Sequence, residues 1–473
     1  MAEPVEATVT SNTSATTTTI ATMSTSTITA TLNLQPNTNY SKNEYSSSQF
    51  YKNITILLYF CTMVETDNTT EVLETASIAG HILLENGAEI SRVEDTMERI
   101  ASHYGVDSGH FFVLSNGIFT TGSGKYANVE FIPIRGIQLS KVVSVNRLSY
   151  EIAAGKHSLQ EARSRLEAIR NAPAKPAWEQ IAGSAFGSAG FCAVFGGGFM
   201  DCAADFVIGA LLYVFCLFVS GSLSKIVGGI CNALVATILC LVSFRLGFGD
   251  SLSNIIIGAV MPLIPGVPFV NGVRDLANSD YIAGLTRLTD AMLGFICIAL
   301  GVSISFLLDG WVFDGMINLT GMTVNPQTAG IGWQCLAAFI GTFAFAILFG
   351  APRGQYFTAG AIGAIGWGAY LILTRICHSG PTVAIIASTA LVCILSRFAA
   401  VRDKCPSTVY LLCGIFPLVP GAGIFWFTYY LVSSRFILSA SAGFAAVKAA
   451  IAIVLGIIVA MELPQRIFSG RKR

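Results

Sequence analysis

The segment MPLIPGVPFVNG, from Met261 to Gly272, decides the fold, because a second copy of its pattern, FPLVPGAGIFWF, runs from Phe416 to Phe427. Each copy places proline, two apolar residues, proline and glycine within strongly apolar surroundings. Proline inside a helix removes a backbone hydrogen bond and clashes with the preceding turn, so each copy predicts a broken helix. A membrane tolerates broken helices only where protein or a water-filled cavity surrounds them. The pair therefore predicts a membrane protein with two broken helices in its interior.

The composition is that of a polytopic membrane protein. Of the 473 residues, 12% are charged, against about 25% in soluble domains. The mean hydropathy is +0.63. The net charge is zero, which gives no electrostatic support for a nucleic-acid partner. Most of the twelve cysteines lie singly in apolar runs, without the spacing of a metal or redox site, so no metal and no cofactor is expected.

The chain divides into four regions. Composition and apolar periodicity separate a polar leader, a small α+β domain and two stretches of apolar segments. These regions are 1–69, the leader; 70–172, the α+β domain; 173–310, the first five-span membrane repeat; and 311–473, the second five-span repeat with a basic tail.

The leader is rich in threonine and serine. Such a composition cannot bury enough apolar surface to fold, so disorder is expected. The leader lacks the pattern of an ordinary signal peptide, and the apolar run within 51–64 is too short to span a bilayer. One hypothesis is that translation starts at Met63, which a mass measurement on the N-terminus of the native protein would test.

The α+β region alternates helical and strand patterns. Apolar positions recur at helical spacing from residue 71, with a break expected at Asn86-Gly87 and an end at Gly105. Two paired strands, HFFVLSNGIFTT and YANVEFIPI, are expected around the turn GSGK. Two further helices are expected near 139–154 and 158–170.

The same region offers no catalytic group. The turn GSGK is not a phosphate loop, because that motif needs glycine where Phe119 stands. No Ser-His-Asp or Cys-His arrangement is visible, and His81, His103 and His110 are expected at the surface. We therefore expect a protein that is not an enzyme.

Ten apolar segments follow, each long enough to cross about 30 Å of hydrocarbon. They lie near 177–197, 202–220, 226–246, 251–269, 283–307, 329–349, 355–374, 380–398, 407–432 and 438–462. Lysine and arginine gather in alternate loops, which places the α+β domain and both termini in the cytoplasm. Arg245, Arg375 and Arg435 are exceptions, because they fall on the outer side.

The two apolar halves repeat each other. The matched segments are IGA at 208–210 and 362–364, ILCLVSFR at 238–245 with LVCILSRF at 391–398, Pro262 with Pro417, and IALGV at 298–302 with IVLGI at 453–457. The offset stays between 153 and 155 residues, which indicates an internal duplication. Each copy holds five spans, an odd number, so the second copy is expected upside down relative to the first. Inverted repeats of this kind are typical of transporters.

Four motifs then occur in a fixed order along the chain. They are LLENGAEISRVEDTMERIASHYG at 83–105, FGGGFMD at 195–201, PLIPGVPFVNGVRDL at 262–276 and AGLTRLTDAMLGF at 283–295. Together they make residues 70–462 resemble the threonine/serine exporter (ThrE) family. The N-terminal half resembles the family's component with a soluble domain, and the C-terminal half resembles its smaller five-span component. In some relatives these halves are separate chains that together export succinate. The resemblance implies proton-coupled export of threonine and serine, or of dicarboxylates.

The two proline motifs are the first candidates for a substrate site. Unwound backbone would present the N–H groups of half-helix ends to a substrate carboxylate. The alternative is two packing kinks in a helix bundle. The candidate residues are Pro262, Pro265, Gly266, Pro417, Pro420 and Gly421.

Ionisable side chains inside the spans form a second set of candidates, because they are costly in a membrane and usually functional. Asp201 and Asp205 are four residues apart and share one face of the second span. A desolvated aspartate there is a candidate for proton coupling. The alternative is an interfacial pair at the outer end of the span, which suits Asp201 better than the deeper Asp205. Lys448, in the last span, is expected either to reach the membrane surface or to pair with an aspartate.

A polar cluster follows the first proline motif on the cytoplasmic side. It consists of Asn271, Arg274 and Asp275, with Arg287 and Asp290 opening the next span. These residues are expected to form a gate of ion pairs or to bind a substrate carboxylate through arginine, and a solvated loop is the alternative. The second copy has no acid here, so the halves are expected to share backbone geometry but not ligands.

The sequence thus predicts an all-α polytopic membrane protein, with ten transmembrane helices as two five-span inverted repeats after a small α+β cytoplasmic domain. The expected function is a secondary exporter of threonine or serine in the plasma (inner) membrane. We expect it to work by alternating access as a proton-coupled antiporter, alone or as a homo-oligomer. The alternatives are a dicarboxylate exporter and a membrane-anchored sensor or assembly protein without transport. Paired broken helices disfavour the last, since an anchor has no use for them.

Overall fold

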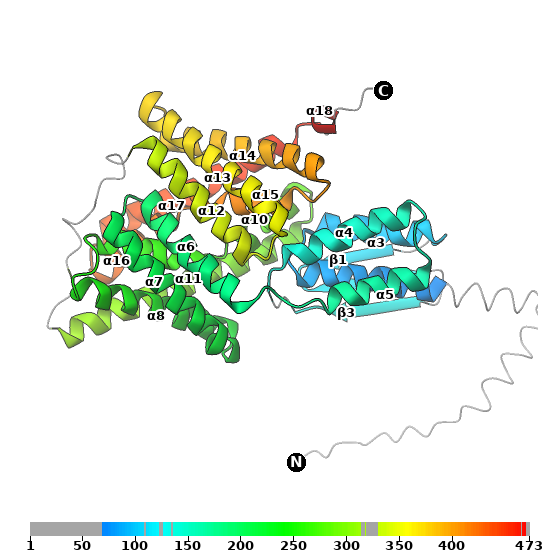
Figure 1. Ribbon diagram of the computed structural model, residues 1–473, viewed down its shortest axis with the longest axis horizontal. Helices are drawn as coiled ribbons and strands as arrows, with labels where there is room; N and C mark the ends of the chain where they lie inside the picture. Colours follow the sequence, from blue (N-terminus) through cyan, green and yellow to red (C-terminus); the bar gives the residue numbers. More distant parts are fainter. Residues whose placement is uncertain are drawn as a thin grey trace, which may run out of the picture. The chain divides into compact units, whose positions relative to one another are not determined.

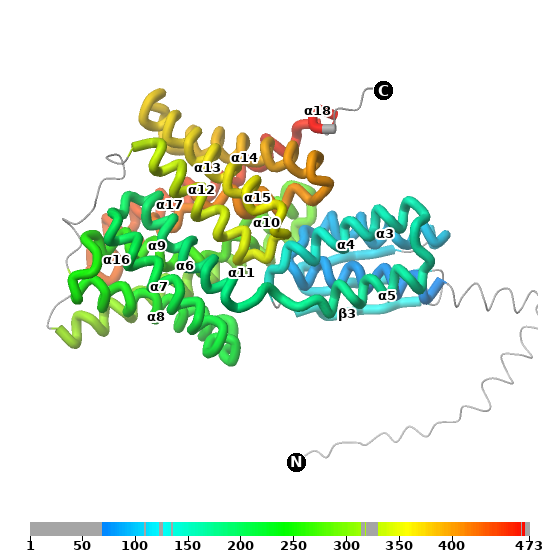
Figure 2. Tube along the Cα trace, in the orientation of Figure 1, coloured from blue at the N-terminus to red at the C-terminus, as the bar shows by residue number. Residues whose placement is uncertain are grey.

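The computed structural model describes residues 69–107, 110–122, 126–133, 136–313, 317, 330–464 and 466–469. The described residues belong to one compact unit, which begins at Asn68. The predictions made for the leader before residue 69, and the hypothesis about Met63, lie outside these residues. Figures 1 and 2 show the path of the chain through a mainly helical structure.

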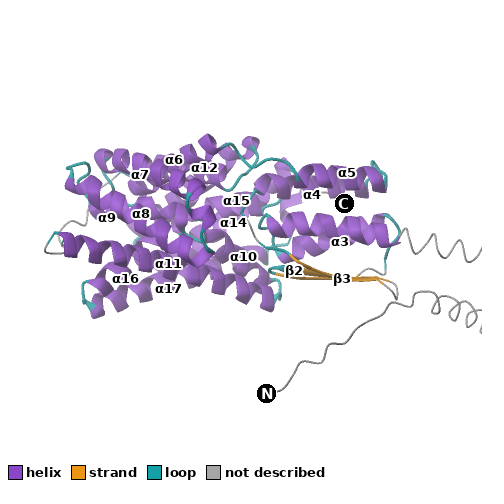
Figure 3. Cartoon of the chain, turned by 90° about the horizontal axis from the view of Figure 1, so that it is seen from below, coloured by secondary structure: helices purple, strands orange, loops and turns teal. Residues whose placement is uncertain are grey.

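The N-terminal domain has the expected α+β composition. Its elements are a helix over 69–85, α3 (Ile90–His103), β1 (His110–Leu114), β2 (Gly117–Gly122), β3 (Tyr126–Phe131), α4 (Leu139–Ala153) and α5 (Leu159–Arg170). The helices cover one face of the sheet (Figure 3). The predicted helices near 139–154 and 158–170 are confirmed. The expected break and stop are also present, and Gly87 and Gly105 have positive φ angles of 84° and 83°, which favour glycine.

The strand prediction was wrong in one respect. HFFVLSNGIFTT folds into two antiparallel strands rather than one, with Leu114 opposite Gly117. The two-residue loop Ser115-Asn116 precedes Gly117, and an Asn-Gly pair is a strong hairpin signal that could have revealed the turn. The expectation that His81 lies at the surface was also wrong. His81 is buried, with Nδ1 2.6 Å from Glu130 Oε1.

The first membrane half follows the N-terminal domain. Its elements are α6 (Ala177–Val194), α7 (Phe199–Phe218), η1 (Ser220–Ser222), α8 (Lys225–Arg245), α9 (Leu252–Val260), η2 (Met261–Leu263), α10 (Gly266–Ala277) and α11 (Tyr281–Val312). Helix α6 packs on α7, and α8 packs on α11. Three long helices therefore precede a broken pair, and one long helix follows it.

The second membrane half has the same order. Its elements are α12 (Ile331–Leu348), η4 (Arg353–Gln355), α13 (Tyr356–Leu371), η5 (Ile372–Ile376), α14 (Pro381–Asp403), α15 (Thr408–Gly414), η6 (Phe416–Leu418), α16 (Gly421–Val432) and α17 (Phe436–Met461), followed by the short α18 (Arg466–Ser469). Helix α12 packs on α13, and α14 packs on α17, so the helix pairs correspond to those of the first half.

The protein is an integral membrane protein. Among the described residues, seven helices are long and apolar enough to cross a membrane, or nine if each bent pair counts as one span. The first of the ten predicted spans corresponds to α6, which is not among them; its Glu179 and its many glycines and serines lower its hydropathy. Large apolar side chains are exposed along several of these helices, for example Leu211 on α7 and Phe444 and Ile451 on α17, as suits contact with lipid.

In each half, a glycine of the last long helix packs on the backbone of a neighbouring helix. A Cβ atom at Gly301 would lie 2.5 Å from the Ile230 carbonyl oxygen of α8, and one at Gly456 would lie 2.7 Å from the Ile386 carbonyl oxygen of α14. Gly301 and Gly456 are 155 residues apart, and the two carbonyls 156. Glycine thus lets α11 and α17 approach their neighbours at equivalent positions.

Helices α6 and α12 cross each other in a reciprocal way. A Cβ atom at Gly190 would lie 2.8 Å from the Gly341 backbone, and one at Gly187 would lie 3.8 Å from the Ala344 side chain. Gly187 and Gly341 are 154 residues apart, as are Gly190 and Ala344. Exchanging the two halves therefore turns the contact of Gly190 with Gly341 into the contact of Ala344 with Gly187. This is the pattern of a contact across a two-fold axis.

Candidate functional site

Both proline motifs break a helix, as predicted. The axis bends by 59° between the α9–η2 segment and α10, and by 44° between the α15–η6 segment and α16. Pro265 and Pro420 have almost the same backbone angles, with φ −76° and ψ 53° in the first and φ −76° and ψ 49° in the second. The two motifs therefore share one local backbone geometry.

The two breaks lie against each other. A Cβ atom at Gly266 would lie 2.5 Å from the Phe416 ring, and a Cβ atom at Gly421 would lie 2.9 Å from Met261 Sδ. Gly266 and Gly421 are 155 residues apart, and so are Met261 and Phe416. The contact is therefore reciprocal, like that of α6 with α12, and we call it the crossing.

The crossing is closed in this conformation. A void of about 10 Å³ lies beside Gly421, lined by residues of α9, α11 and α16 and by Ile264, and it is at the lower limit for holding one water molecule. The Phe416 ring is packed by the rings of Phe191, Phe345 and Phe349. A solute could pass only if the two halves separated here.

The glycines at the crossing predict an asymmetric effect on stability. Gly266→Ala places a methyl group against the rigid Phe416 ring, whereas Gly421→Ala meets Met261 and Ile264, whose flexible ends can move. We expect Gly266→Ala to cost about 1–3 kcal/mol and Gly421→Ala less. Melting of the purified protein measures this, with Gly332→Ala as control, because nothing lies within 4 Å of its Cβ position. Equal melting of Gly266→Ala and the control would contradict the close approach.

Asp205 lies in a buried polar region between α6, α7 and α9. It has no exposed surface, and neither carboxylate oxygen has a hydrogen-bond partner of ordinary length among the described residues. Its Oδ2 occupies the space where a Cβ atom at Gly258 would stand, with Cys192 and the Ser188 carbonyl oxygen beside it. An unpaired buried charge is costly, so a carboxylate at this position needs a proton or a cation.

The carboxylate of Asp201 is fully hydrogen-bonded, unlike that of Asp205 on the same helix. It accepts hydrogen bonds from three backbone N–H groups, those of Gly198 at 2.8 Å, Asp250 at 2.6 Å and Ser251 at 2.9 Å. It thereby caps α7 and fixes the loop before α9. Among the described residues Lys448 has no aspartate partner, and its side chain is exposed on α17.

The predicted polar cluster contains an ion pair of its own and also binds the N-terminal domain. Asn271 Nδ2 donates to the Gly87 carbonyl at 2.8 Å. Arg287 donates to Asp275 at 2.7 Å and to the Ala88 carbonyl at 2.8 Å. All of these side chains are buried, so the alternative of a solvated loop is wrong for them.

Asp290 stands apart from that cluster. It forms an ion pair with Lys225 of α8 and lines a cavity of about 340 Å³. The same cavity reaches Pro265 and Pro268 of the first proline motif, and the buried Asn232 Oδ1 at its wall has no partner among the described residues. The cavity therefore connects an ion pair with the broken helix.

Glu89 completes the buried cluster, and the sequence analysis missed it. Its side chain forms an ion pair with Arg274, accepts a hydrogen bond from Arg92 at 2.7 Å and accepts one from Thr408 at 2.9 Å. Thr408 also accepts a hydrogen bond from Arg274 at 2.7 Å. An acid directly after the helix break was the available signal, but it did not reveal a partner in α10.

A second missed residue is Asp309, near the end of α11. Arg245 donates two hydrogen bonds to its carboxylate, at 2.8 and 2.9 Å. Arg245 was one of the three arginines predicted on the outer side of the membrane, against the usual cytoplasmic placement of basic residues. Its ion pair with Asp309 accounts for this exception, because the carboxylate balances the charge of the arginine. Asp309 sits within a long apolar run, and an ionisable side chain in such a run is itself a signal.

Glu89 should make the stability of the protein depend on acidity. Burial by itself would raise the pKa of Glu89, but Arg274, Arg92 and the hydrogen bond from Thr408 together lower the pKa from 4.5 to about 2. Its contribution to the free energy of unfolding, about 3 kcal/mol, is therefore complete above pH 4.5 and is lost as the pH falls from 4.5 toward 2. Melting curves between pH 6 and 3 should fall more steeply for the wild type than for Glu89→Gln. Parallel curves would contradict the role of Glu89.

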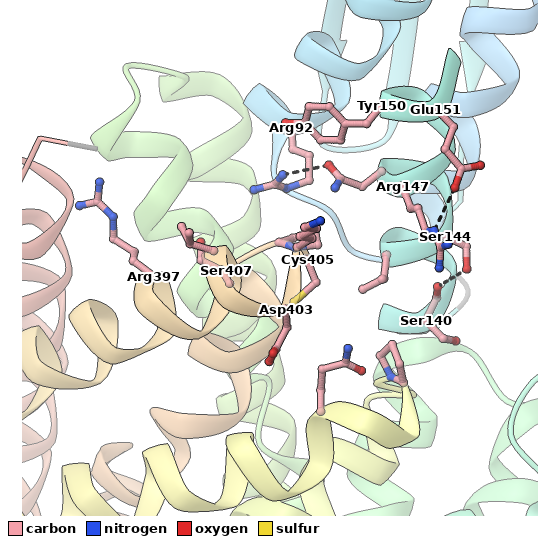
Figure 4. A pocket seen from close by; sticks show the side chains of 18 of the residues that line it. Arg92, Ser140, Ser144, Arg147, Tyr150, Glu151, Arg397, Asp403, Cys405 and Ser407 are labelled. Atoms are coloured by element: carbon pink, nitrogen blue, oxygen red, sulfur yellow. Dashed lines mark hydrogen bonds and ion pairs between the residues drawn. The ribbon is translucent and has the colours of Figure 1, made fainter. Parts of the chain in front are cut away.

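Arg274 and Glu89 line a cavity that adjoins a larger groove. A polar cavity of about 500 Å³, which we call the vestibule, is lined by residues of α3, α10, α14 and α15 and by the end of α17. A groove of about 1140 Å³ runs between α4 and the connection from α14 to α15 (Figure 4). Arg92, Arg397 and Ser407 line both spaces, so the vestibule adjoins the groove.

Comparison with known proteins gives two family matches. The model described as "Putative threonine/serine exporter" matches residues 74–308, and the model described as "Threonine/Serine exporter, ThrE" matches residues 334–462. The two matches divide the chain where the two membrane halves meet.

Curated relatives agree at low identity. The chain is 23% identical over 378 residues to a "Probable threonine/serine exporter" of Mycobacterium tuberculosis, covering 76% of this chain and 69% of the relative. It is 22% identical over 409 residues to a "Threonine/serine exporter" of Corynebacterium glutamicum, covering 84% and 83%. It is also 24% identical over 263 residues to a "Probable succinate transporter subunit YjjP" of Escherichia coli, covering 53% and 100%. No solved structure matches the chain.

Proposed function

The chain belongs to the threonine/serine exporter family, and from this premise we propose that it is a secondary exporter of small polar carboxylates, with threonine and serine as its first expected substrates. The observation that carries the proposal is the crossing, where two broken helices from the two halves meet reciprocally in the protein interior. Half-helix ends in that position can bind a carboxylate without a charged side chain.

The proposed mechanism is alternating access between two inverted five-span halves. In this scheme α6 and α12 are the first spans of the halves, and the broken pairs are the fourth. The reciprocal contacts at the crossing and between α6 and α12 support a two-fold relation between the halves, and the odd number of spans implies inversion. Both termini would then lie in the cytoplasm, at the plasma (inner) membrane.

Proton coupling is assigned to Asp205. The aspartate is buried without a partner of ordinary hydrogen-bond length among the described residues, and it packs on α9, the helix that leads into the first proline motif. Gain or loss of a proton there would change the contact between α7 and α9. Asp201, whose carboxylate is saturated by backbone N–H groups, would serve structure alone.

Dicarboxylate export is the second candidate function. It is supported by the relatives named as succinate transporter subunits, which this chain matches over 92% and 100% of their length. A dicarboxylate and an amino acid each offer a carboxylate to a helix end. The polar cavities do not by themselves choose between the two.

Transport by the purified full chain tests the proposal. Proteoliposomes loaded with labelled threonine, serine or succinate should release one of them faster when a pH gradient is imposed, and the released compound names the substrate class. Ethanolamine, which is serine without its carboxylate, is the matched control and should stay inside. Retention of all three carboxylates under every gradient would contradict export.

A further inference from the structure

Glu89 places a carboxylate inside the vestibule. Its side chain is 3% exposed and forms an ion pair with Arg274, while the Thr408 hydroxyl bridges the two side chains. An arginine with an adjoining hydroxyl is a common arrangement for holding a small carboxylate. Glu89 thus occupies the position that a carboxylate solute would take in this space.

The vestibule is suited to receive such a solute. Its volume of about 500 Å³ exceeds that of a small amino acid, and the groove beside it provides a way in from the N-terminal domain side (Figure 4). Charged side chains of both signs line it. The charged lining residues are Glu89, Arg92, Asp95, Arg274, Arg397 and Glu462.

We propose that the vestibule receives the carboxylate of the exported solute at Arg274, and that Glu89 is a tethered carboxylate that holds this position until the solute displaces it. The inference rests on the proposed export function and adds to it a receiving site and a built-in competitor. The inference also assigns a role in transport to the N-terminal domain. Among the described carboxylates of that domain, only Glu89 forms an ion pair with an arginine of α10.

A free carboxylate can compete with Glu89 because Glu89 does not saturate Arg274. The Arg274 Nε is buried and has no hydrogen-bond partner among the described residues, whereas Arg274 contacts Glu89 and Thr408 through Nη1. A solute carboxylate that reaches Nε as well can bind in two places at once, which is the stronger mode for arginine.

Displacement of Glu89 should loosen the segment that carries it. Residues 86–89 form the break between the helix over 69–85 and α3. The N–H groups of Gly87 and Ala88 donate within the turn, to the Leu84 and Leu83 carbonyls, and their own carbonyl groups bind Asn271 and Arg287 of the membrane half. Ser91, in the first turn of α3, lines the vestibule and accepts a hydrogen bond from Asn278 at 3.0 Å. Its exposure therefore reports whether Glu89 is in place.

The first test measures thiol labelling of Ser91→Cys in the full chain, with Cys377→Ser as background because Cys377 is the exposed cysteine among those described. Serine or succinate should accelerate labelling by a maleimide severalfold, and ethanolamine should not. The compound that acts identifies the class of solute. Unchanged labelling with both carboxylates, or slower labelling, would overturn the proposal, since a solute bound beside Glu89 without displacing it would only shield the thiol.

The second test measures binding of labelled serine and labelled succinate to purified Glu89→Gln. Removing the competing charge should lower the half-saturating concentration about tenfold, while Glu98→Gln, which changes an exposed acid on the helix that follows Glu89, should leave it unchanged. Equal or weaker binding by folded Glu89→Gln would overturn the proposal. The two hypotheses fail separately: transport without a change in labelling or affinity rejects the tethered carboxylate alone, and carboxylate-dependent labelling without transport rejects export alone.

Discussion

Replacing Asp205 with asparagine should abolish the response of export to a pH gradient while leaving the protein folded. Asparagine has nearly the same shape as aspartate, and the carboxylate loses no ordinary hydrogen bond in the exchange, because it has none to described residues. What is lost is the ability to take up and release a proton. We expect gradient-driven export to fall at least about tenfold, the equivalent of about 1.4 kcal/mol in the barrier.

The control for this variant is Asp250→Asn, which removes an exposed carboxylate near the same end of α7. It should keep the full response to the gradient. Exchange of labelled for unlabelled solute at equal pH should continue in Asp205→Asn, because exchange needs no net proton movement. A full gradient response in Asp205→Asn would remove this residue from the coupling mechanism.

Replacing Arg287 with alanine should have the largest effect on stability. Arg287 is the ion-pair partner of Asp275, whose side chain has no exposed surface, and it also binds the Ala88 carbonyl. The change leaves a buried carboxylate uncompensated, which costs about 3–5 kcal/mol. Melting of the purified protein should show this loss, and the N-terminal domain should become more accessible to protease.

Two further variants make the Arg287 result specific. Arg435→Ala removes an exposed arginine at the start of α17 and should leave the melting temperature unchanged. Adding Asp275→Asn to Arg287→Ala removes the stranded charge and should recover part of the lost stability. If Arg287→Ala melted like Arg435→Ala, the buried pair would not stabilise the contact between the N-terminal domain and α10.

The elements of the fold were largely predictable because local rules determine them. Proline chemistry placed both breaks, and glycine placed the turn at Gly87. The constant offset paired the two halves before any contact was known. The hairpin at Ser115-Asn116 was missed although its signal is equally local.

The site was less predictable, because its contacts join residues far apart in sequence. Glu89 and Arg274 are 185 residues apart, and Gly266 and Phe416 are 150. No periodicity or motif predicts which acid forms an ion pair with which arginine when the two are so far apart in sequence. The sequence therefore identified Arg274 as a carboxylate ligand candidate but could not show that the chain supplies a carboxylate of its own.

Asp201 and Asp205 illustrate the same limit at short range. Helical spacing correctly placed both on one helix, but their environments differ. The loop before α9 supplies two N–H groups to Asp201, whereas Asp205 fills the space that a side chain at Gly258 would take. Only the packing of α9 against α7 shows that Asp201 caps a helix and that Asp205 is the candidate for proton coupling.

The central claim is that the solute passes between the two broken helices, and a reversible cross-link at the crossing tests it most directly. Met261→Cys and Gly421→Cys together place two thiols where a Cβ atom at Gly421 would lie 2.9 Å from Met261 Sδ. The account predicts that a short thiol-cleavable cross-linker stops transport in proteoliposomes, that reduction restores it, and that neither single variant responds. Transport by the fully cross-linked protein at the rate of the reduced protein would contradict the account.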